Sequence, residues 1–223
     1  FDHLLYTGSG NVAKYVMQGA SKNLVPVTLE LGGKSPVIVG KSADIDATAK
    51  RVMFGKTLNA GQICLAPDYV MVHSSKKDEF IESTKEAVKE YFPTMKDNDD
   101  YSSVINENHF NRLNGLLDDA REKGATIEPI NPANEDFNQQ EFYKIPPTLV
   151  LNTTDDMRIM KEEIFGPLMP VREFESLEEP ISFINNYDKP LGLYYFGKDK
   201  KEESEIMDKT TSGGVTINNV MGH

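Results

Sequence analysis

Short apolar runs alternate with segments of helical periodicity along almost the whole chain. Continuous apolar runs at 37–39 and 69–72 are typical of strands that are buried on both faces. Apolar residues spaced by three and four predict helices between such runs, most clearly over 106–123, where Gly124 follows as a stop signal. The same pattern predicts further strands at 3–7, 26–31, 148–151, 169–174, 193–196 and 215–218, and further helices near 10–20, 44–58, 76–91, 177–187 and 200–211.

The repeated order of strand, helix and strand predicts an α/β fold. Such units are joined in parallel through helices, so we expect a three-layer domain with a mostly parallel sheet flanked by helices on both faces. Asp44 is expected to cap the helix that follows it, and Ser74 or Ser75 the charged helix from residue 76. Residues 131–147 are rich in Asn, Pro, Glu and Gln and are expected to form a loop or a β-ribbon.

The charge of the chain excludes several classes of partner. Its 223 residues hold 24 Lys and Arg against 35 Asp and Glu, which gives a formal net charge of −11. A surface this acidic does not suit nucleic acid or anionic membranes, both of which attract basic residues. No apolar run approaches the roughly 20 residues of a membrane span. We therefore expect no nucleic-acid or membrane partner and a cytoplasmic location.

The single cysteine, Cys64, excludes an internal disulfide and a cysteine-rich zinc site, so no metal is expected. A lone cysteine is most often a small buried apolar residue. Here it lies in the segment NAGQICLAP at 59–67, between the end of a helix and a buried strand. Glycine and proline on either side indicate an unusual backbone. A loop held by a rigid scaffold is also a common place for a nucleophilic thiolate.

Glu30 is a second candidate, because it stands between two leucines at the end of a strand that closes on Gly32 and Gly33. One interpretation is simple alternation, with Glu30 on the wet face of the strand. The other is a carboxylate in a partly apolar site that acts as a general base on water. The pattern alone leaves both interpretations open.

Two further segments have weaker chemical signals. The turn GSG at 8–10 joins a strand to a helix, where free N–H groups and the helix dipole favour a phosphate. Many such turns bind nothing, and this one is not a full dinucleotide fingerprint. Residues 161–167, KEEIFGP, follow a helical pattern and close on Gly-Pro, which on composition alone indicates a charged helix end followed by a turn.

Taken together, these segments resemble the aldehyde dehydrogenase superfamily. The matching motifs are YTGS at 6–9, LELGGK at 29–34, N-x-G-Q-x-C at 59–64 and EEIFGP at 162–167, in that order along the chain. The spacing between Glu30 and Cys64 also matches. DYV at 68–70, YYFG at 194–197 and TTSGGV at 210–215 are similar to the coniferyl-aldehyde and class 3 branch, which acts on aromatic or fatty aldehydes.

The resemblance implies oxidation of an aldehyde to its carboxylic acid with NAD or NADP, NAD being favoured. It implies that the Cys64 thiolate attacks the aldehyde, that a thioester remains after hydride transfer, and that Glu30 activates the water that hydrolyses it. Asn59 matches a supporting position near the thiol. The cofactor-binding positions that it implies are Gly8, Ser9 on the pyrophosphate, Leu31, Glu163 on the nicotinamide ribose and Phe165 beside the nicotinamide ring.

The resemblance also implies two domains. Residues 1–30 correspond to the end of a dinucleotide-binding domain, and residues 31–223 to a catalytic domain that stops before the family's C-terminal oligomerisation segment. The first residue is Phe rather than Met and strand patterns stand at both ends, so we expect a piece of a longer protein. Such a piece is expected to bind NAD weakly or not at all and to turn over poorly, while the intact protein is expected to be a homodimer or homotetramer acting on a small-molecule aldehyde.

Three other functions stay open at this point. An inactive fragment that serves as a structural or assembly module would show no activity when the missing half is supplied. A CoA-acylating relative would pass the acyl group to a thiol and would not need Glu30 to activate water. A cysteine hydrolase would need a histidine beside Cys64, and none of the four histidines lies in a recognisable context of that kind.

Overall fold

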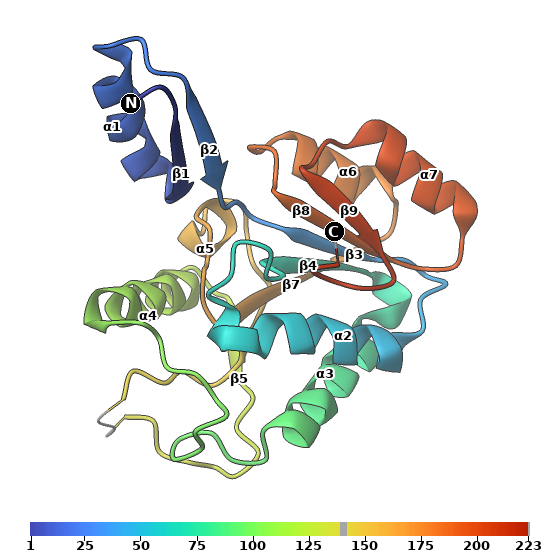
Figure 1. Cartoon of the computed structure of the whole chain (residues 1–223). Coiled ribbons are helices and arrows are strands. Elements are labelled where there is room, and N and C mark those ends of the chain that lie inside the picture. Colours follow the sequence, from blue (N-terminus) through green and yellow to red (C-terminus); the bar gives the residue numbers. More distant parts are fainter. Residues whose placement is uncertain (139–141, 223) are drawn as a thin grey trace.

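The computed structural model describes residues 1–138 and 142–222, whose strands form two sheets (Figure 1). The larger sheet has the strand order β5-β6-β7-β4-β3-β8-β9, and neighbouring strands are parallel except for the antiparallel pair β5 and β6. The expectation of a mostly parallel α/β sheet is thereby confirmed. The strands of this sheet are β3 (Pro36–Val39), β4 (Tyr69–His73), β5 (Thr126–Pro129), β6 (Thr148–Leu151), β7 (Leu168–Phe174), β8 (Gly192–Phe196) and β9 (Gly214–Ile217).

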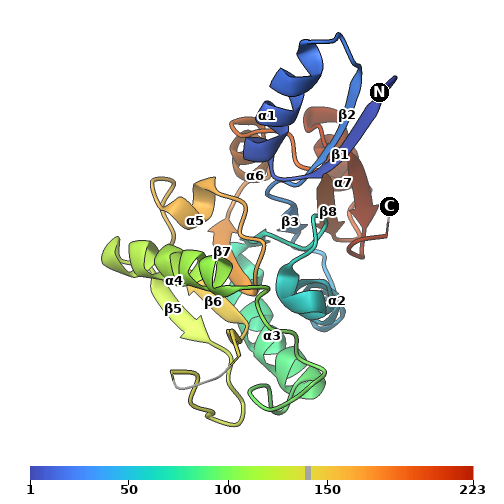
Figure 2. The same cartoon turned by 60° about the vertical axis from the view of Figure 1, so that its left-hand side comes forward.

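Helices cover both faces of this sheet, as the two views of the ribbon show (Figures 1 and 2). Successive residues of a strand point to opposite faces, so Val37 and Val39 enter one apolar core and Ile38 enters the other. The first core is closed by α2 (Ile45–Thr57) and α3 (Lys77–Tyr91). The second is closed by α4 (Glu107–Glu122), α5 (Arg158–Lys161), α6 (Glu178–Asn185) and α7 (Lys200–Lys209).

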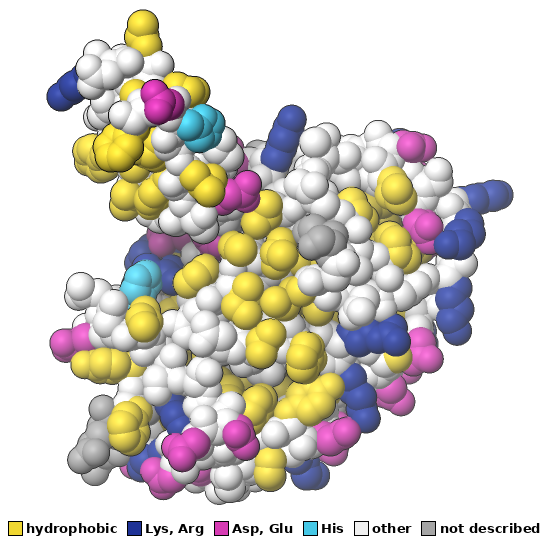
Figure 3. Space-filling view, in the orientation of Figure 1, with side chains coloured by type: hydrophobic (Ala, Val, Ile, Leu, Met, Phe, Trp, Pro, Cys, Tyr) yellow, Lys and Arg dark blue, Asp and Glu magenta, His cyan; other side chains and the backbone are white. Residues whose placement is uncertain are grey.

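The beginning of the chain forms a small lobe that stands away from this body (Figure 3). It consists of β1 (Leu4–Gly8), α1 (Gly10–Ser21) and β2 (Val27–Leu31), and the two strands pair in parallel as a sheet of their own. The helix buries only Ala13, which lies one turn after the N-cap Ser9. Because β2 runs into β3 through four residues, the lobe is attached directly to the centre of the larger sheet.

Local sequence signals placed most element ends correctly and a few wrongly. Asp44 caps α2 as expected, its side chain accepting a hydrogen bond from the Ala47 amide. The expected serine cap of α3 is wrong. Residues Ser74–Lys76 form a short 3-10 helix (η2), in which the His73 side chain accepts from the Ser75 amide, and α3 starts without a side-chain cap. Strand β5 was not expected, because it is a four-residue edge strand that is only half buried and closes on proline.

The loop expected at 131–147 is found over its described residues, 131–138 and 142–147, which contain no strand. Glu135 holds this loop to the segment that follows α3, since its carboxylate accepts hydrogen bonds from the amides of Met95 and Lys96 at 2.7 and 3.0 Å. The Tyr101 hydroxyl donates to the Ile145 carbonyl at 2.6 Å. The two loops therefore support each other at the end of the body away from the lobe (Figure 1).

Candidate active site

The segments with chemical signals meet at one edge of the larger sheet. Glu30, Cys64 and Glu163 lie in the stretches that lead into β3, β4 and β7, and these three strands are parallel neighbours. The first two stretches are joined directly, because the Asp68 amide donates to the Ser35 carbonyl at 2.9 Å. Parallel sheets usually bind ligands at the carboxyl ends of their strands. Here the segments that carry the candidate residues lie at the other end of the strands, where β3, β4 and β7 begin.

The loop that carries Cys64 starts with a run of left-handed residues. Asn59, Ala60 and Gly61 have φ values of 51°, 52° and 72°, within a short 3-10 turn, η1 (Leu58–Gly61), that follows α2. This conformation costs a residue with a side chain roughly 1–2 kcal/mol, so the run is strained at its first two positions. It reverses the chain within a few residues and leaves Cys64 half buried on the loop that follows.

Hydrogen bonds anchor this loop on both sides of the thiol. Before it, Gln62 donates to the Ser103 carbonyl and accepts from the Ile105 amide, each at 2.9 Å. After it, the Tyr194 hydroxyl donates to the Leu65 carbonyl at 2.6 Å, and the Lys56 ammonium donates to the Pro67 carbonyl at 2.9 Å. The thiol is thus presented by a loop whose backbone is fixed from the sheet and from α2.

Two of these anchors have shifted acid–base properties. Lys56 is fully buried on α2, and this desolvation lowers its pKa to about 8. The nearby Asp68 carboxylate opposes that shift. Burial likewise raises the pKa of Tyr194 to about 12, with a smaller contribution from the neighbouring Cys64. Tyr194 is therefore a stable hydrogen-bond donor at neutral pH.

Glu30 lies on the exposed face of β2, opposite Thr7 of β1. Among residues 1–138 and 142–222 its carboxylate has neither a hydrogen-bond partner nor an ion-pair partner. Its neighbours in the strand, Leu29 and Leu31, are half buried. The residue thus follows the alternation of the strand with its carboxylate open to water, and its role as a general base stays a prediction.

Glu163 sits against the turn that follows β2. Its carboxylate accepts a hydrogen bond from the Gly33 amide, and a Cβ atom added to Gly32 would lie 2.0 Å from the Glu163 Oε1 atom. Only glycine leaves room for the carboxylate at this place. Burial raises the pKa of Glu163, and the Gly33 amide partly offsets that shift. Arg112 of α4 holds the following peptide groups by donating to the carbonyls of Glu163 and Ile164.

An ion pair joins the three stretches beneath these side chains. The Lys34 ammonium contacts the Asp68 carboxylate, and their side chains are only 11% and 3% exposed. The same ammonium donates to the carbonyls of Ile159 and Glu162 at 2.8 and 2.9 Å, while the Asp68 Oδ2 atom accepts from the Ile164 amide at 2.8 Å. Lys34 and Asp68 thus connect three segments: the turn after β2, the loop at 59–67 that carries Cys64 (the thiol loop), and the segment at 162–167 that carries Glu163.

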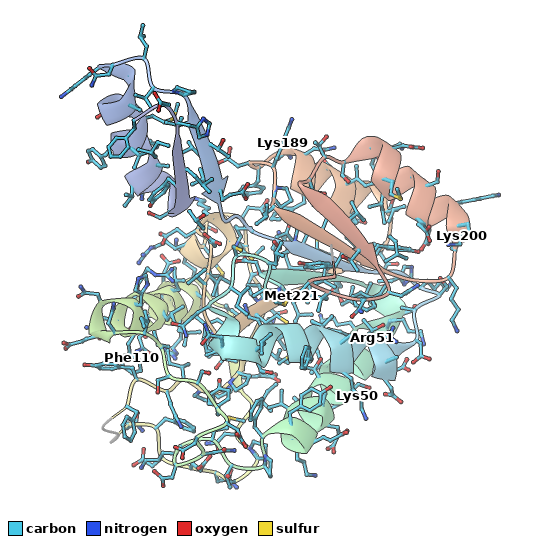
Figure 4. All side chains as sticks on the ribbon, viewed as in Figure 1. Lys50, Arg51, Phe110, Lys189, Lys200 and Met221 are labelled. Carbon is cyan, nitrogen blue, oxygen red and sulfur yellow. The ribbon has the colours of Figure 1, made fainter. Side chains whose placement is uncertain are left out.

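A pocket of about 430 Å³ lies between the lobe and the body. Its walls come from the start of α1, the turn after β2, α5, α6 and the loop before β8. Lys189 belongs to that last loop, at the corner of the body nearest the lobe (Figure 4). Leu31 and Glu163, two of the five expected cofactor positions, line the pocket. Gly8, Ser9 and Phe165 do not line it.

Of the other three expected positions, Gly8 and Ser9 adjoin residues that line the pocket. Gly8 ends β1 opposite Leu31. Ser9 is the N-cap of α1, with its hydroxyl accepting from the Val12 amide at 3.4 Å, and the adjacent Gly10 lines the pocket. Phe165 is 36% exposed and has a φ of 47°, so its ring stands out from the segment that begins with Glu163. Gly10, the first residue of α1, and Glu163 thus line the same pocket.

Residues 1–138 and 142–222 form neither a metal site nor a helix that could span a membrane. These residues contain no cluster of three or more His, Cys, Asp or Glu side chains placed to hold a metal ion. Every helix in the same part of the chain is too short or too polar to span a bilayer.

Comparison with known proteins identifies the family. Residues 1–223 match the Aldehyde dehydrogenase family along their whole length. The chain belongs to the aldehyde dehydrogenase family. It is 55% identical to the probable coniferyl aldehyde dehydrogenase of Caulobacter vibrioides over all 223 residues, which are 46% of that relative. The chain thus spans about half the length of the curated relatives it matches.

Solved aldehyde dehydrogenases have the same fold. The substrate-bound AldH of Staphylococcus aureus superimposes with a TM-score of 0.90 at 41% identity, covering 99% of this chain and 47% of that one. The betaine aldehyde dehydrogenase of Staphylococcus aureus, solved in complex with NAD+, superimposes with a TM-score of 0.86 at 31% identity, covering 100% of this chain and 44% of that one. Family members use NAD or NADP.

The sequence did not single out several residues that shape this site. Lys34, Asp68 and Tyr194 stand inside motifs that it did identify, but their roles depend on contacts between distant segments. The sequence does not indicate a role for Arg112, because a polar residue is ordinary at its position on an amphipathic helix. It does indicate one for Lys56, which follows Val52 by four residues on the apolar stripe of α2, where a charged residue calls for an explanation.

Proposed function

We propose that this chain carries the nucleophile and the general base of an enzyme that oxidises an aldehyde to its carboxylic acid with NAD or NADP. The observation that supports this most strongly is that the segments carrying Glu30, Cys64 and Glu163 lead into the neighbouring parallel strands β3, β4 and β7 and are joined by the Lys34–Asp68 pair, in a chain that belongs to the aldehyde dehydrogenase family. The expected division at residue 30 fits this proposal, since the lobe would be the end of the cofactor domain.

In this proposal the Cys64 thiolate attacks the carbonyl carbon of the aldehyde. The carbon–sulfur bond forms as the carbonyl electron pair moves to oxygen, which gives a thiohemiacetal anion. Over the described residues, the Cys64 amide donates to no other group, so it is available to stabilise that oxyanion. Loss of hydride from the same carbon leaves a thioester on Cys64.

Glu30 then serves the second half of the reaction. Its carboxylate takes a proton from a water molecule, the resulting hydroxide attacks the thioester carbon, and the Cys64 thiolate leaves. An exposed carboxylate without a partner in the described part of the chain suits this role, because it can hold a water molecule without first breaking an ion pair. The products are the carboxylic acid and the free thiolate.

The residues around the pocket fit a nicotinamide dinucleotide. The bound cofactor would supply the acceptor for the hydride. Glu163, held in place by the glycine turn, offers carboxylate oxygens to ribose hydroxyls, and Leu31 offers an apolar wall. Ser9 and the first amides of α1 would hold phosphate, with Gly8 leading into that turn. The exposed ring of Phe165 would pack beside the nicotinamide.

Aromatic aldehydes are the proposed substrate class, with coniferyl aldehyde as the first to test, because the relative from Caulobacter vibrioides is named for it. Long-chain aldehydes are the second class. The proposed acid product also separates this function from a CoA-acylating one, in which an acyl thioester of CoA would form and Glu30 would have no role.

The direct test uses the intact protein with coniferyl aldehyde and a long-chain aldehyde, each with NAD+ and with NADP+. Formation of reduced nicotinamide together with the free acid, and loss of both in Cys64→Ala, is the expected result. Acyl-CoA as the product, or undiminished turnover in Cys64→Ala, would overturn the proposal. No activity in any combination would favour the structural or assembly module.

A further inference from the structure

We propose that Asp68 is a positioning residue that fixes Glu163 against the turn after β2. The inference rests on the proposed function, because its consequence is tight binding of the nicotinamide cofactor by Glu163. It concerns an ion pair that touches neither the aldehyde nor the thiol.

Asp68 holds one of the two peptide groups that flank Glu163. Its Oδ2 atom accepts from the Ile164 amide, which belongs to the peptide group after Glu163, at 2.8 Å. Its other oxygen contacts the Lys34 ammonium. Both oxygens of a carboxylate that is 3% exposed are therefore used by fixed donors. A group so fully engaged and so far from solvent is a fixed point of the structure.

Lys34 holds the other peptide group. Its ammonium donates to the Glu162 carbonyl, which belongs to the peptide group before Glu163, at 2.9 Å, and to the Ile159 carbonyl at 2.8 Å. With the contact to Asp68, all three N–H bonds of the ammonium are directed at acceptors. The Lys34–Asp68 pair thus forms hydrogen bonds with the backbone on both sides of Glu163.

The same pair also fixes the position of the Glu163 carboxylate relative to Gly32 and Gly33. Lys34 directly follows Gly32 and Gly33, which form the surface on which the Glu163 carboxylate rests. Fixing Lys34 to the Glu163 backbone therefore fixes the distance between that carboxylate and its glycine cradle. Arg112 adds a contact from α4, but it holds only the carbonyl side of Glu163 and of Ile164.

The thiol loop does not depend on this pair to the same extent. Gln62 and Tyr194 anchor its backbone on both sides of Cys64 through hydrogen bonds that involve neither Asp68 nor Lys34. Loss of the Asp68 charge should therefore weaken cofactor binding far more than it changes the thiol. This separation distinguishes a positioning role from a general loss of structure.

Asp68→Asn tests the inference in the intact protein. Asparagine has one acceptor oxygen where two donors, Lys34 and the Ile164 amide, need one each, so one grip on Glu163 is lost. We expect the NAD+ or NADP+ dissociation constant, measured by calorimetry, to rise about tenfold or more. Hydrogen exchange of the Ile164 amide without cofactor should quicken, while the rate of Cys64 alkylation by iodoacetamide should change by less than about twofold.

Asp118→Asn is the matched control, because Asp118 pairs with Arg121 on the exposed side of α4 at 2.7 Å. It should leave all three measurements unchanged. If Asp68→Asn does not fold, Lys34→Arg keeps the charge but cannot direct three donors in the same way, and it should shift the same two quantities. Unchanged cofactor affinity and unchanged Ile164 exchange in a folded variant would overturn the inference. A wild-type protein that binds neither cofactor would instead contradict the proposed function, and the exchange measurement would still test the grip of Asp68.

Discussion

Gly61 lies so close to Gly166 that a Cβ atom on Gly61 would come within 2.4 Å of the Gly166 carbonyl oxygen. Gly61 belongs to the thiol loop and Gly166 to the segment that begins with Glu163. The two stretches that would bring nucleophile and cofactor together are thus in direct backbone contact. Gly61 also has a φ of 72°. Both the close approach to Gly166 and the left-handed backbone conformation therefore require glycine at this position.

Gly61→Ala should therefore destabilise the protein and impair catalysis together. We expect a loss of about 2 kcal/mol or more in the free energy of unfolding, from the left-handed conformation and the clash with backbone combined. Urea denaturation measures it. Gly124→Ala is the control, since Gly124 has a φ of 92° at the end of α4 but nothing within 4 Å of the added Cβ atom. An equal loss in the two variants would show that the contact with Gly166 adds nothing.

Lys56 should give the protein a stability that rises in alkaline solution. In the folded state its pKa is about 8, against an ordinary value of 10.5, so between these pH values the unfolded chain binds more protons than the folded one. Stability then increases with pH across that interval, by roughly 3 kcal/mol for a shift of this size. Urea denaturation from pH 7.5 to 9.5, below the range in which the tyrosines of the unfolded chain ionise, measures this rise.

Lys56→Met should abolish that rise, whereas Lys50→Met, at an exposed lysine that pairs with Glu90 on the surface, should keep it. Because methionine leaves the Pro67 carbonyl unpaired, the absolute stability of Lys56→Met is not the quantity to compare. A pH profile that is the same in the wild type and in Lys56→Met would contradict a buried, charged Lys56.

Gly32→Ala should weaken cofactor binding by displacing the Glu163 carboxylate, since the new methyl group would lie 2.0 Å from its Oε1 atom. We expect the dissociation constant for NAD+ or NADP+ to rise about tenfold, the effect of losing a hydrogen bond to a charged group. Gly19→Ala on α1, where the added Cβ atom meets nothing within 4 Å, is the control. Equal affinity in Gly32→Ala and wild type would remove Glu163 from the cofactor site.

The sequence predicted the fold well because the main strands are buried on both faces. Runs such as 37–39 and 69–72 have no polar interruption, and the helices between them have clear apolar stripes. It missed β5 because an edge strand with one half-exposed face lacks that signal. It misplaced the cap of α3 because the choice between Ser75 and the His73 ring depends on how the chain leaves β4.

The site was predictable only where a motif carries chemistry in its own residues. Cys64 and Glu30 stand out from their immediate neighbours. The grip of Lys34 and Asp68 on Glu163 joins residues that are far apart in the sequence, up to 128 positions, and no local pattern specifies it. Likewise, the approach of Gly61 to Gly166 follows from the order of β3, β4 and β7 in the sheet, which the chain reveals only when folded.

The most direct test of the central claim is a rapid-mixing measurement of reduced nicotinamide with the intact protein and its Glu30→Gln variant. If Cys64 forms the thioester and Glu30 activates the water that removes it, Glu30→Gln should keep a burst of about one equivalent per active site and then turn over slowly, by roughly a factor of 10² to 10⁴. Equal loss of the burst and of the steady state would contradict the assignment of Glu30 as the base for hydrolysis.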